Sequence, residues 1–188
     1  MVGRPPEVSA AEAAGFPIAA CTAYGSLTRV AGLMLSENGK TKTILVTAGS
    51  SGVGHYAVQL AELGNMHVTA TCMACNLDFI KGLGVDKVLD YRVLSGAPTY
   101  GAALRSPSGK KYDFMLHCTS GIPWSTFCLE SKVIDLTPSP RAMWFFAVKK
   151  VTPSKKQLVP YVETTEADNL EFLVKLVQEG KLKAVVRI

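Results

Sequence analysis

Residues 43–54 read TILVTAGSSGVG, and this stretch decides the fold. Its first six residues are apolar or β-branched, which is typical of a short parallel strand covered on both faces. The run ends at Gly49. Apolar residues then recur at helical spacing, at Val53, Ala57, Leu60 and Ala61. Gly64 stands where such a helix would end. The stretch therefore predicts a strand, a glycine-rich turn and a helix.

The same alternation extends outward from this unit. Further strands are predicted at 66–71, 87–91, 113–118 and 132–136. A short helix is predicted around 77–83, which Asn76 can cap and Gly84 can end. Strands that alternate with helices imply βαβ crossovers and hence a parallel sheet. The predicted fold class is α/β, with a Rossmann-type doubly wound parallel sheet.

Helices are also predicted at both ends of the chain. Ser9 and Glu12 have the capping-box spacing, so a helix should begin near Ser9, and a second should run from Ala20 to about Ala31. Near the C-terminus an apolar stripe at helical spacing ends at Gly180, with the members Leu170, Leu173, Val174 and Val177. Residues 184–188 read as a strand that is cut off.

These elements suggest three parts. Residues 1–18 are expected to form a lead-in and linker helix, residues 19–180 a dinucleotide-binding domain, and residues 181–188 the start of a strand belonging to a missing second domain. The start of the chain has no apolar signal core, and no window reaches the roughly 20 apolar residues of a membrane span. A soluble or at most peripheral protein is expected.

Charge and cysteine content narrow the function classes. The net charge is +5, with lysine pairs at 110–111, 149–150 and 155–156 that can attract phosphates, anionic lipids or nucleic acid. No nucleic-acid motif accompanies them, which favours a solvated basic face. The five cysteines are odd in number and indicate reduced intracellular thiols. Cys72 and Cys75 form a single CxxC, too little to predict a metal site.

The turn at 49–54 carries the chemistry. In a dinucleotide-binding turn the first glycine permits the tight bend, the second lets the backbone approach a pyrophosphate, and the third lets helix and strand pack closely. Gly49 and Gly54 fit the first and third roles. Ser51 stands in the second, with Gly52 beside it. The alternative is an α/β domain whose turn only needs small residues, or whose binding site has decayed.

The end of the second predicted strand indicates which dinucleotide would bind. An acidic side chain there would bind the ribose hydroxyls of NAD, but residues 68–76 contain no carboxylate. Asn76 and Lys81 can donate hydrogen bonds to a 2′-phosphate, although no arginine is present to clamp it. NADPH is therefore predicted over NADH.

Several motifs together resemble one family. They are Val2–Pro6, Thr22–Tyr24, the turn at 48–54, Val68–Cys72, His117–Cys118, Gly121–Trp124 and Lys155–Pro160. The chain is similar in these to the quinone oxidoreductase family of zinc-free medium-chain reductases, especially its plant chloroplast-envelope members. The resemblance implies NADPH-dependent hydride transfer to quinones or to the activated double bond of enones, usually by a homodimer. It also implies the chloroplast envelope or cytoplasm as compartment, with peripheral membrane association open.

The resemblance also implies a set of cofactor-binding residues. Thr22 would lie near the nicotinamide, and the turn residues Gly49, Ser50, Ser51, Gly52 and Val53 would lie under the pyrophosphate. Cys72 and Asn76 would lie at the adenosine phosphate, Tyr91 near the adenosine, and Cys118 with Thr119 along the nicotinamide. No catalytic residue is named. His55, His67 and His117 are each expected to be structural.

The departures from the family lead to further expectations. Most of the GroES-like substrate domain is expected to be absent, and Cys75 occupies a place where relatives tend to have arginine. Because such substrates bind between two domains, the active site should be incomplete and turnover weak or absent. The alternatives are a noncatalytic Rossmann module for interaction or dimerisation, and a basic nucleic-acid-binding protein whose affinity falls steeply with salt.

Overall fold

The computed structural model describes residues 3–6, 8–33, 42–92, 112–119, 132–137, 157–163 and 166–185. Six strands form one parallel sheet: β1 (Thr43–Val46), β2 (His67–Cys72), β3 (Lys87–Asp90), β4 (Phe114–His117), β5 (Lys132–Asp135) and β6 (Gln157–Pro160). The helices are α1 (Ala10–Gly25), a π-helix (Ser26–Val30), α2 (Gly54–Leu63), a 3₁₀ turn (Ala74–Asn76), α3 (Leu77–Lys81) and α7 (Ala167–Gln178).

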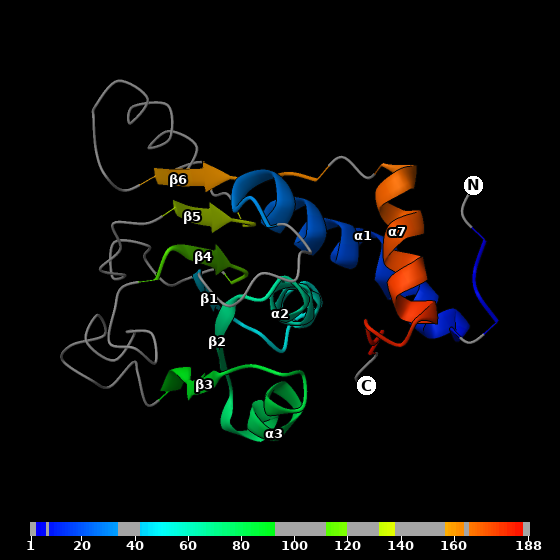
Figure 1. The fold of residues 1–188 in the computed structure, drawn as a ribbon. Coiled ribbons are helices and arrows are strands. Elements are labelled where there is room, and N and C mark those ends of the chain that lie inside the picture. The colour runs from blue at the N-terminus through cyan, green and yellow to red at the C-terminus, as the bar shows by residue number, and fades with distance from the viewer. Residues whose placement is uncertain are drawn as a thin grey trace.

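The strand order is β3-β2-β1-β4-β5-β6, and every ladder is parallel (Figure 1). The chain therefore moves outward from β1 in one direction and then in the other, which confirms the predicted Rossmann-type doubly wound sheet. The order reverses between β1 and β4. In an open α/β sheet, ligands bind outside the carboxyl ends of the strands at such a reversal.

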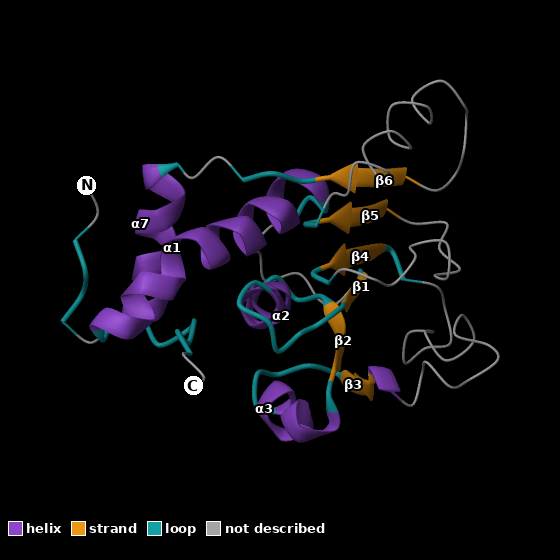
Figure 2. Ribbon diagram, turned by 180° about the vertical axis from the view of Figure 1, so that it is seen from behind, coloured by secondary structure: helices purple, strands orange, loops and turns teal. Residues whose placement is uncertain are grey.

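The central strands β1, β2 and β4 are largely buried, as their apolar composition predicts. Ile44, Leu45 and Val46 of β1 have no exposed surface, and Leu116 of β4 and Ile134 of β5 are equally buried. α2 packs on β1 and β2, while α1 packs against both α2 and α7 (Figure 2). No helix among the described residues is both long and apolar enough to span a membrane.

The N-terminal helix differs in part from its prediction. Ser9 caps α1 as predicted, since its hydroxyl accepts the Glu12 N–H at 3.3 Å and the Glu12 carboxylate accepts the Ser9 N–H at 2.9 Å. The second helix predicted from Ala20 is wrong as a separate element, because α1 continues to Gly25 and then widens into the π-helix. Gly25 has helical dihedral angles and does not interrupt the helix. The proposed boundary at residue 18 falls inside α1.

One edge of the sheet and the C-terminal residues also differ from the sequence prediction. β6 was not predicted. The strand predicted at 184–188 is absent at 184 and 185, which have no regular structure, and its other residues lie outside the described part. There Lys183 is held instead by Gln59 of α2, whose Oε1 accepts the Lys183 N–H at 2.8 Å and whose Nε2 donates to the Lys183 carbonyl at 3.2 Å. The three lysine pairs and Cys128 also lie outside the described residues.

Candidate functional site

The turn after β1 is fixed to the end of β2. Ala48 has a positive φ of 49°, and its N–H donates to the Thr71 hydroxyl at 3.2 Å. The Gly49 N–H donates to the Thr71 carbonyl at 2.8 Å. A Cβ at Gly49 would lie 3.0 Å from the Cβ of Ala70. The first glycine of the turn therefore sits where backbone and neighbouring strand approach closely.

Gly54 has the close-packing geometry predicted for the third glycine. A Cβ there would lie 2.3 Å from the Ala48 carbonyl oxygen and 2.9 Å from the Cα of Gly49. Both are backbone atoms, so no side-chain rotation can make room for the extra atom. The first turn of α2 can cross the end of β1 this closely only because residue 54 has no side chain.

Ser51 and Gly52 shape the start of α2. The Ser51 hydroxyl accepts the Gly54 N–H at 3.1 Å, and its carbonyl accepts the His55 N–H at 3.2 Å. Gly52 is exposed, and a Cβ on it would meet nothing within 4 Å. Within the described residues, the N–H groups of Ser50, Gly52 and Val53 have no hydrogen-bond acceptor. Free N–H groups at a helix N-terminus attract anions.

The second βα connection adjoins this turn. The Asn76 Nδ2 donates to the Ser50 hydroxyl at 3.0 Å, so two residues predicted for different parts of a cofactor lie together. Cys72 is buried, and its burial, aided by Asp90 and Cys75, raises the pKa of its thiol. Cys75 is exposed. Asp90 was missed by sequence reasoning because it belongs to β3, yet it lies opposite Cys72 in the ladder.

A second group of predicted residues gathers at β4. The Cys118 N–H donates to the Thr47 hydroxyl at 3.0 Å, and the Thr119 carbonyl accepts from the Thr137 hydroxyl at 3.1 Å. Burial, together with the Asp135 carboxylate, raises the pKa of the Cys118 thiol to about 12. At neutral pH this thiol is protonated and is not a nucleophile. Thr47 was missed because its partner is 71 residues away.

Histidines border both groups and make structural contacts. The His117 Nδ1 lies 3.3 Å from the Thr47 hydroxyl, and burial lowers the pKa of this imidazole although Asp135 opposes the shift. The His55 Nδ1 lies 3.0 Å from the Ser51 carbonyl, and burial lowers its pKa too. His67 is the first residue of β2, at the amino ends of the strands, and its Nδ1 lies 3.4 Å from Asp86.

Two further predicted residues, Thr22 and Tyr91, lie in other parts of the chain, on α1 and directly after β3. Thr22 is one turn before Gly25 on α1, and a Cβ at Gly25 would lie 2.1 Å from the Tyr161 hydroxyl, just after β6. Tyr91 directly follows β3 and is partly buried. Among the described residues, no hydrogen bond joins Thr22 or Tyr91 to either group. The structure therefore brings together Ser50 with Asn76 and Cys118 with Thr47.

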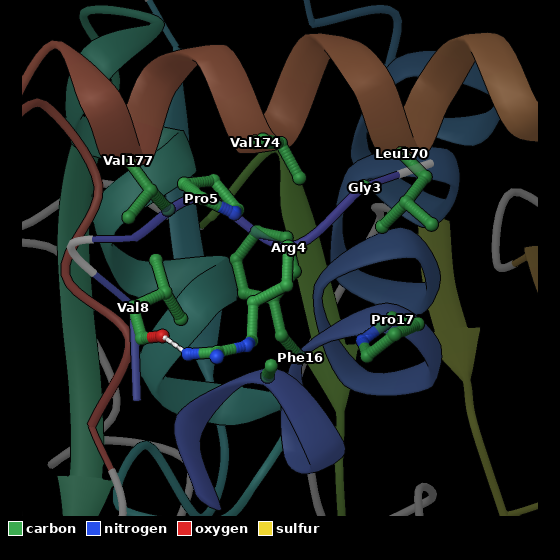
Figure 3. Close-up of a pocket in the computed structure, with 10 residues that line it drawn as sticks. Gly3, Arg4, Pro5, Val8, Phe16, Pro17, Leu170, Val174 and Val177 are labelled. Atoms are coloured by element: carbon green, nitrogen blue, oxygen red, sulfur yellow. Dashed lines mark hydrogen bonds between the residues drawn. The ribbon is translucent and has the colours of Figure 1, made fainter. Parts of the chain in front are cut away.

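A separate apolar pocket lies away from these residues (Figure 3). Its cavity of about 90 Å³ lies between the N-terminal segment, α1 and α7, and the Arg4 guanidinium donates to the Val8 carbonyl at its edge. The lining residues are Gly3, Arg4, Pro5, Val8, Ala13, Phe16, Pro17, Leu170, Val174 and Val177. None of them was predicted to bind cofactor. No cluster of three potential metal ligands occurs within the described ranges.

Comparison with known proteins gives the ancestry. The chain is 59% identical over 189 residues to the chloroplast envelope quinone oxidoreductase homolog of Arabidopsis thaliana, across 98% of this chain and 56% of that protein. The chain is similar to members of the quinone oxidoreductase family over nearly all of its length. The chloroplastic quinone-oxidoreductase homolog of Spinacia oleracea has the same identity and coverage. The chain spans about half the length of these quinone oxidoreductase relatives. No family model matches the sequence.

A solved structure supports the fold. The quinone oxidoreductase from Coxiella burnetii superposes with a TM-score of 0.75 over 98% of this chain and 54% of that one, at 24% sequence identity. At this identity the likeness concerns the fold alone. The shared part is the parallel sheet with its flanking helices.

Proposed function

We propose that this chain is the nucleotide-binding part of an NADPH-dependent oxidoreductase that transfers hydride to a quinone or to the activated double bond of an enone. The carrying observation is the start of α2. There the N–H groups of Ser50, Gly52 and Val53 are free within the described part of the chain, and Gly52 leaves open space beside them. A pyrophosphate is the ligand that such a helix N-terminus accommodates.

The remaining site residues would extend along the cofactor in both directions. Asn76 adjoins Ser50 and would lie with Cys72 at the adenosine phosphate, and Tyr91 would lie near the adenosine. Cys118 and Thr119 would lie along the nicotinamide, with Thr22 nearby. When bound, the reduced nicotinamide supplies the hydride, and the protein supplies orientation. We expect turnover by these 188 residues alone to be weak or absent, because such substrates bind between two domains and the chain spans about half the length of its relatives.

The domain division and partners are part of the same proposal. Residues 19–180 would form the nucleotide-binding domain, with 1–18 as lead-in and 181–188 leading into the substrate domain. We further propose a homodimer in the chloroplast envelope or cytoplasm, with peripheral membrane association open. The support is the similarity to relatives whose names place them in the chloroplast. Sedimentation of the purified chain would test the dimer, and a monomer at high micromolar concentration would contradict it.

Titration of the purified chain with NADPH, followed by cofactor fluorescence, tests the function directly. We expect saturable binding, weaker with NADH, since residues 68–76 contain no carboxylate to hold the ribose hydroxyls. Cys75→Arg offers a sharper test, because an arginine can form an ion pair with the 2′-phosphate of NADPH, whereas NADH has only an uncharged hydroxyl at that position. This variant should bind NADPH about ten-fold more tightly and leave NADH unchanged. Folded protein that binds neither nucleotide would contradict the proposal.

A noncatalytic interaction module is the second candidate. It is favoured by two exposed apolar side chains, since Ile18 of α1 and Val162 after β6 are 77% and 78% exposed. The NADPH titration separates the candidates. A folded chain that binds no nucleotide but forms a defined complex, lost when Ile18 is replaced by Ser, would support the interaction module.

A further inference from the structure

We propose that Thr47 is a positioning residue whose hydroxyl holds the Cys118 peptide and so places the nicotinamide half of the cofactor site. The inference rests on the proposed function, since it concerns how the same crevice receives a dinucleotide. Thr47 follows β1 directly and stands where the strand order reverses between β1 and β4. It is 1% exposed, so its hydroxyl acts within the protein and not on solvent.

Thr47 joins β1 to β4 through both backbone and side chain. Its N–H donates to the Leu116 carbonyl at 3.0 Å, and its hydroxyl accepts the Cys118 N–H at 3.0 Å. The β1–β4 ladder ends one residue earlier, at the pair Val46 and Leu116. In a parallel ladder the next bond would go to a backbone carbonyl. Here the side-chain oxygen takes its place, at the point where the two strands part.

The hydroxyl is also held in orientation. It lies 3.3 Å from the His117 Nδ1 and 3.4 Å from the Leu116 carbonyl, and both are buried. A hydroxyl has one proton and two acceptor sites. The Cys118 N–H occupies one acceptor site of the Thr47 hydroxyl. The hydroxyl proton can then be donated to the His117 Nδ1 or to the Leu116 carbonyl. If His117 instead carries a proton on Nδ1, that N–H can be donated to the second acceptor site of the hydroxyl. In each arrangement the Cys118 N–H keeps its acceptor.

The opposite end of β1 provides a matched comparison. Thr43 also joins β1 to β4, since its hydroxyl accepts the Asp113 N–H at 3.1 Å. That N–H has a second acceptor, however, because the Thr43 carbonyl lies 3.0 Å away. The Thr43 hydroxyl is therefore partly redundant, and it lies at the edge of the sheet away from the crevice. Of these two threonines, Thr47 is the one whose hydroxyl is the sole acceptor for its partner's N–H among the described contacts.

Loss of the Thr47 hydroxyl should affect one half of the cofactor. In a doubly wound sheet the first three strands receive the adenosine half and the next three the nicotinamide half. Without its acceptor, the part-buried Cys118 N–H should move toward another, because a donor left unsatisfied away from water is costly. Cys118 and Thr119 would shift with it. Ser50 and Asn76, which bond each other on the adenosine side, would not.

The test compares three variants with two ligands. Thr47→Val removes the hydroxyl at constant size, Thr47→Ser keeps it, and Thr43→Val removes the matched hydroxyl. Adenosine 2′,5′-bisphosphate carries only the adenosine half, so it reports on general damage to the site. We expect Thr47→Val to bind NADPH about ten-fold more weakly with unchanged bisphosphate affinity. Thr47→Ser and Thr43→Val should match the wild type for both ligands.

The outcomes separate the inference from the function on which it rests. Wild-type binding of NADPH with equal binding by Thr47→Val would overturn the positioning role. An equal loss for both ligands would overturn it too, because the hydroxyl would then be merely structural. Wild-type protein that binds neither ligand would overturn the proposed function and this role together. Faster amide exchange at Cys118 in cofactor-free Thr47→Val, but not in Thr43→Val, would support the proposed hydrogen bond.

Discussion

Alanine at position 54 would add one methyl group where α2 crosses the end of β1. The added Cβ would lie 2.3 Å from the Ala48 carbonyl oxygen and 2.9 Å from the Cα of Gly49. Carbon atoms in contact normally lie about 3.5–4 Å apart. Both neighbours belong to a turn that is already held by hydrogen bonds to Thr71. The overlap can be relieved only if the backbone of the turn or the start of α2 moves.

The expected destabilisation follows from two opposing effects. Overpacking typically costs about 1–3 kcal/mol, and a clash with backbone belongs at the upper end. Alanine is a better helix former than glycine by about 1 kcal/mol, which offsets part of this. Gly54→Ala should therefore lower the free energy of unfolding by about 2 kcal/mol, or the melting temperature by roughly 4–8 °C for a chain of this size. NADPH affinity should fall as well.

Gly52→Ala provides the control, measured by urea unfolding followed by circular dichroism. Gly52 is exposed, and a Cβ on it would meet nothing within 4 Å, so the free energy of unfolding should stay within about 0.5 kcal/mol of the wild type. The comparison isolates the clash, because both variants add the same methyl group to the same turn. If Gly54→Ala unfolded at the wild-type urea concentration, the close-packing argument would be refuted.

Two further predictions concern buried polar side chains. Gln59→Leu should lower the free energy of unfolding by about 1–3 kcal/mol, because the N–H and the carbonyl of Lys183 both lose their hydrogen-bond partner. The same urea assay measures this, and an unfolding midpoint equal to that of the wild type would contradict it. Burial lowers the folded-state pKa of His55 and His117, so the unfolded chain binds more protons between the folded and unfolded values. Stability should therefore be full above about pH 6.5 and fall as the pH drops below it, by at most about 1.4 kcal/mol per pH unit for each histidine. His117→Asn should reduce this slope in a pH series of urea unfolding curves, and an unchanged slope would exclude His117 as a source.

The sheet could be predicted where the apolar run had no competing signal. β1 and β2 consist largely of buried β-branched and small residues, and their predicted bounds are correct to within one or two residues. β6 lies beside lysine and proline in a segment whose local composition gives no strand pattern. It becomes a strand because β5 offers a parallel edge.

The candidate site could be predicted only in its local part. The glycine spacing gave the close approach at Gly49 and Gly54, because a βα turn is built from residues adjacent in sequence. The hydrogen bonds that fix this turn come from Thr71, 23 residues away, and the bond from Cys118 to Thr47 spans 71 residues. No periodicity in the sequence encodes such pairs. They follow from strand order, which only the folded sheet supplies.

In the proposed site, we expect cofactor preference and fold stability to depend on different residues. Asp90 lies opposite Cys72 in the β2–β3 ladder. Its carboxylate accepts the backbone N–H of Arg92 at 2.9 Å, so this acidic group is already hydrogen-bonded to the backbone just after β3. Cys75 is exposed at the end of the same connection. Substitution of an exposed side chain usually changes stability by less than about 0.5 kcal/mol, whereas Gly54 has no room for a methyl group. In the proposed site, we therefore expect that residues near Cys75 can change the choice of nucleotide while the turn at 49–54 stays fixed.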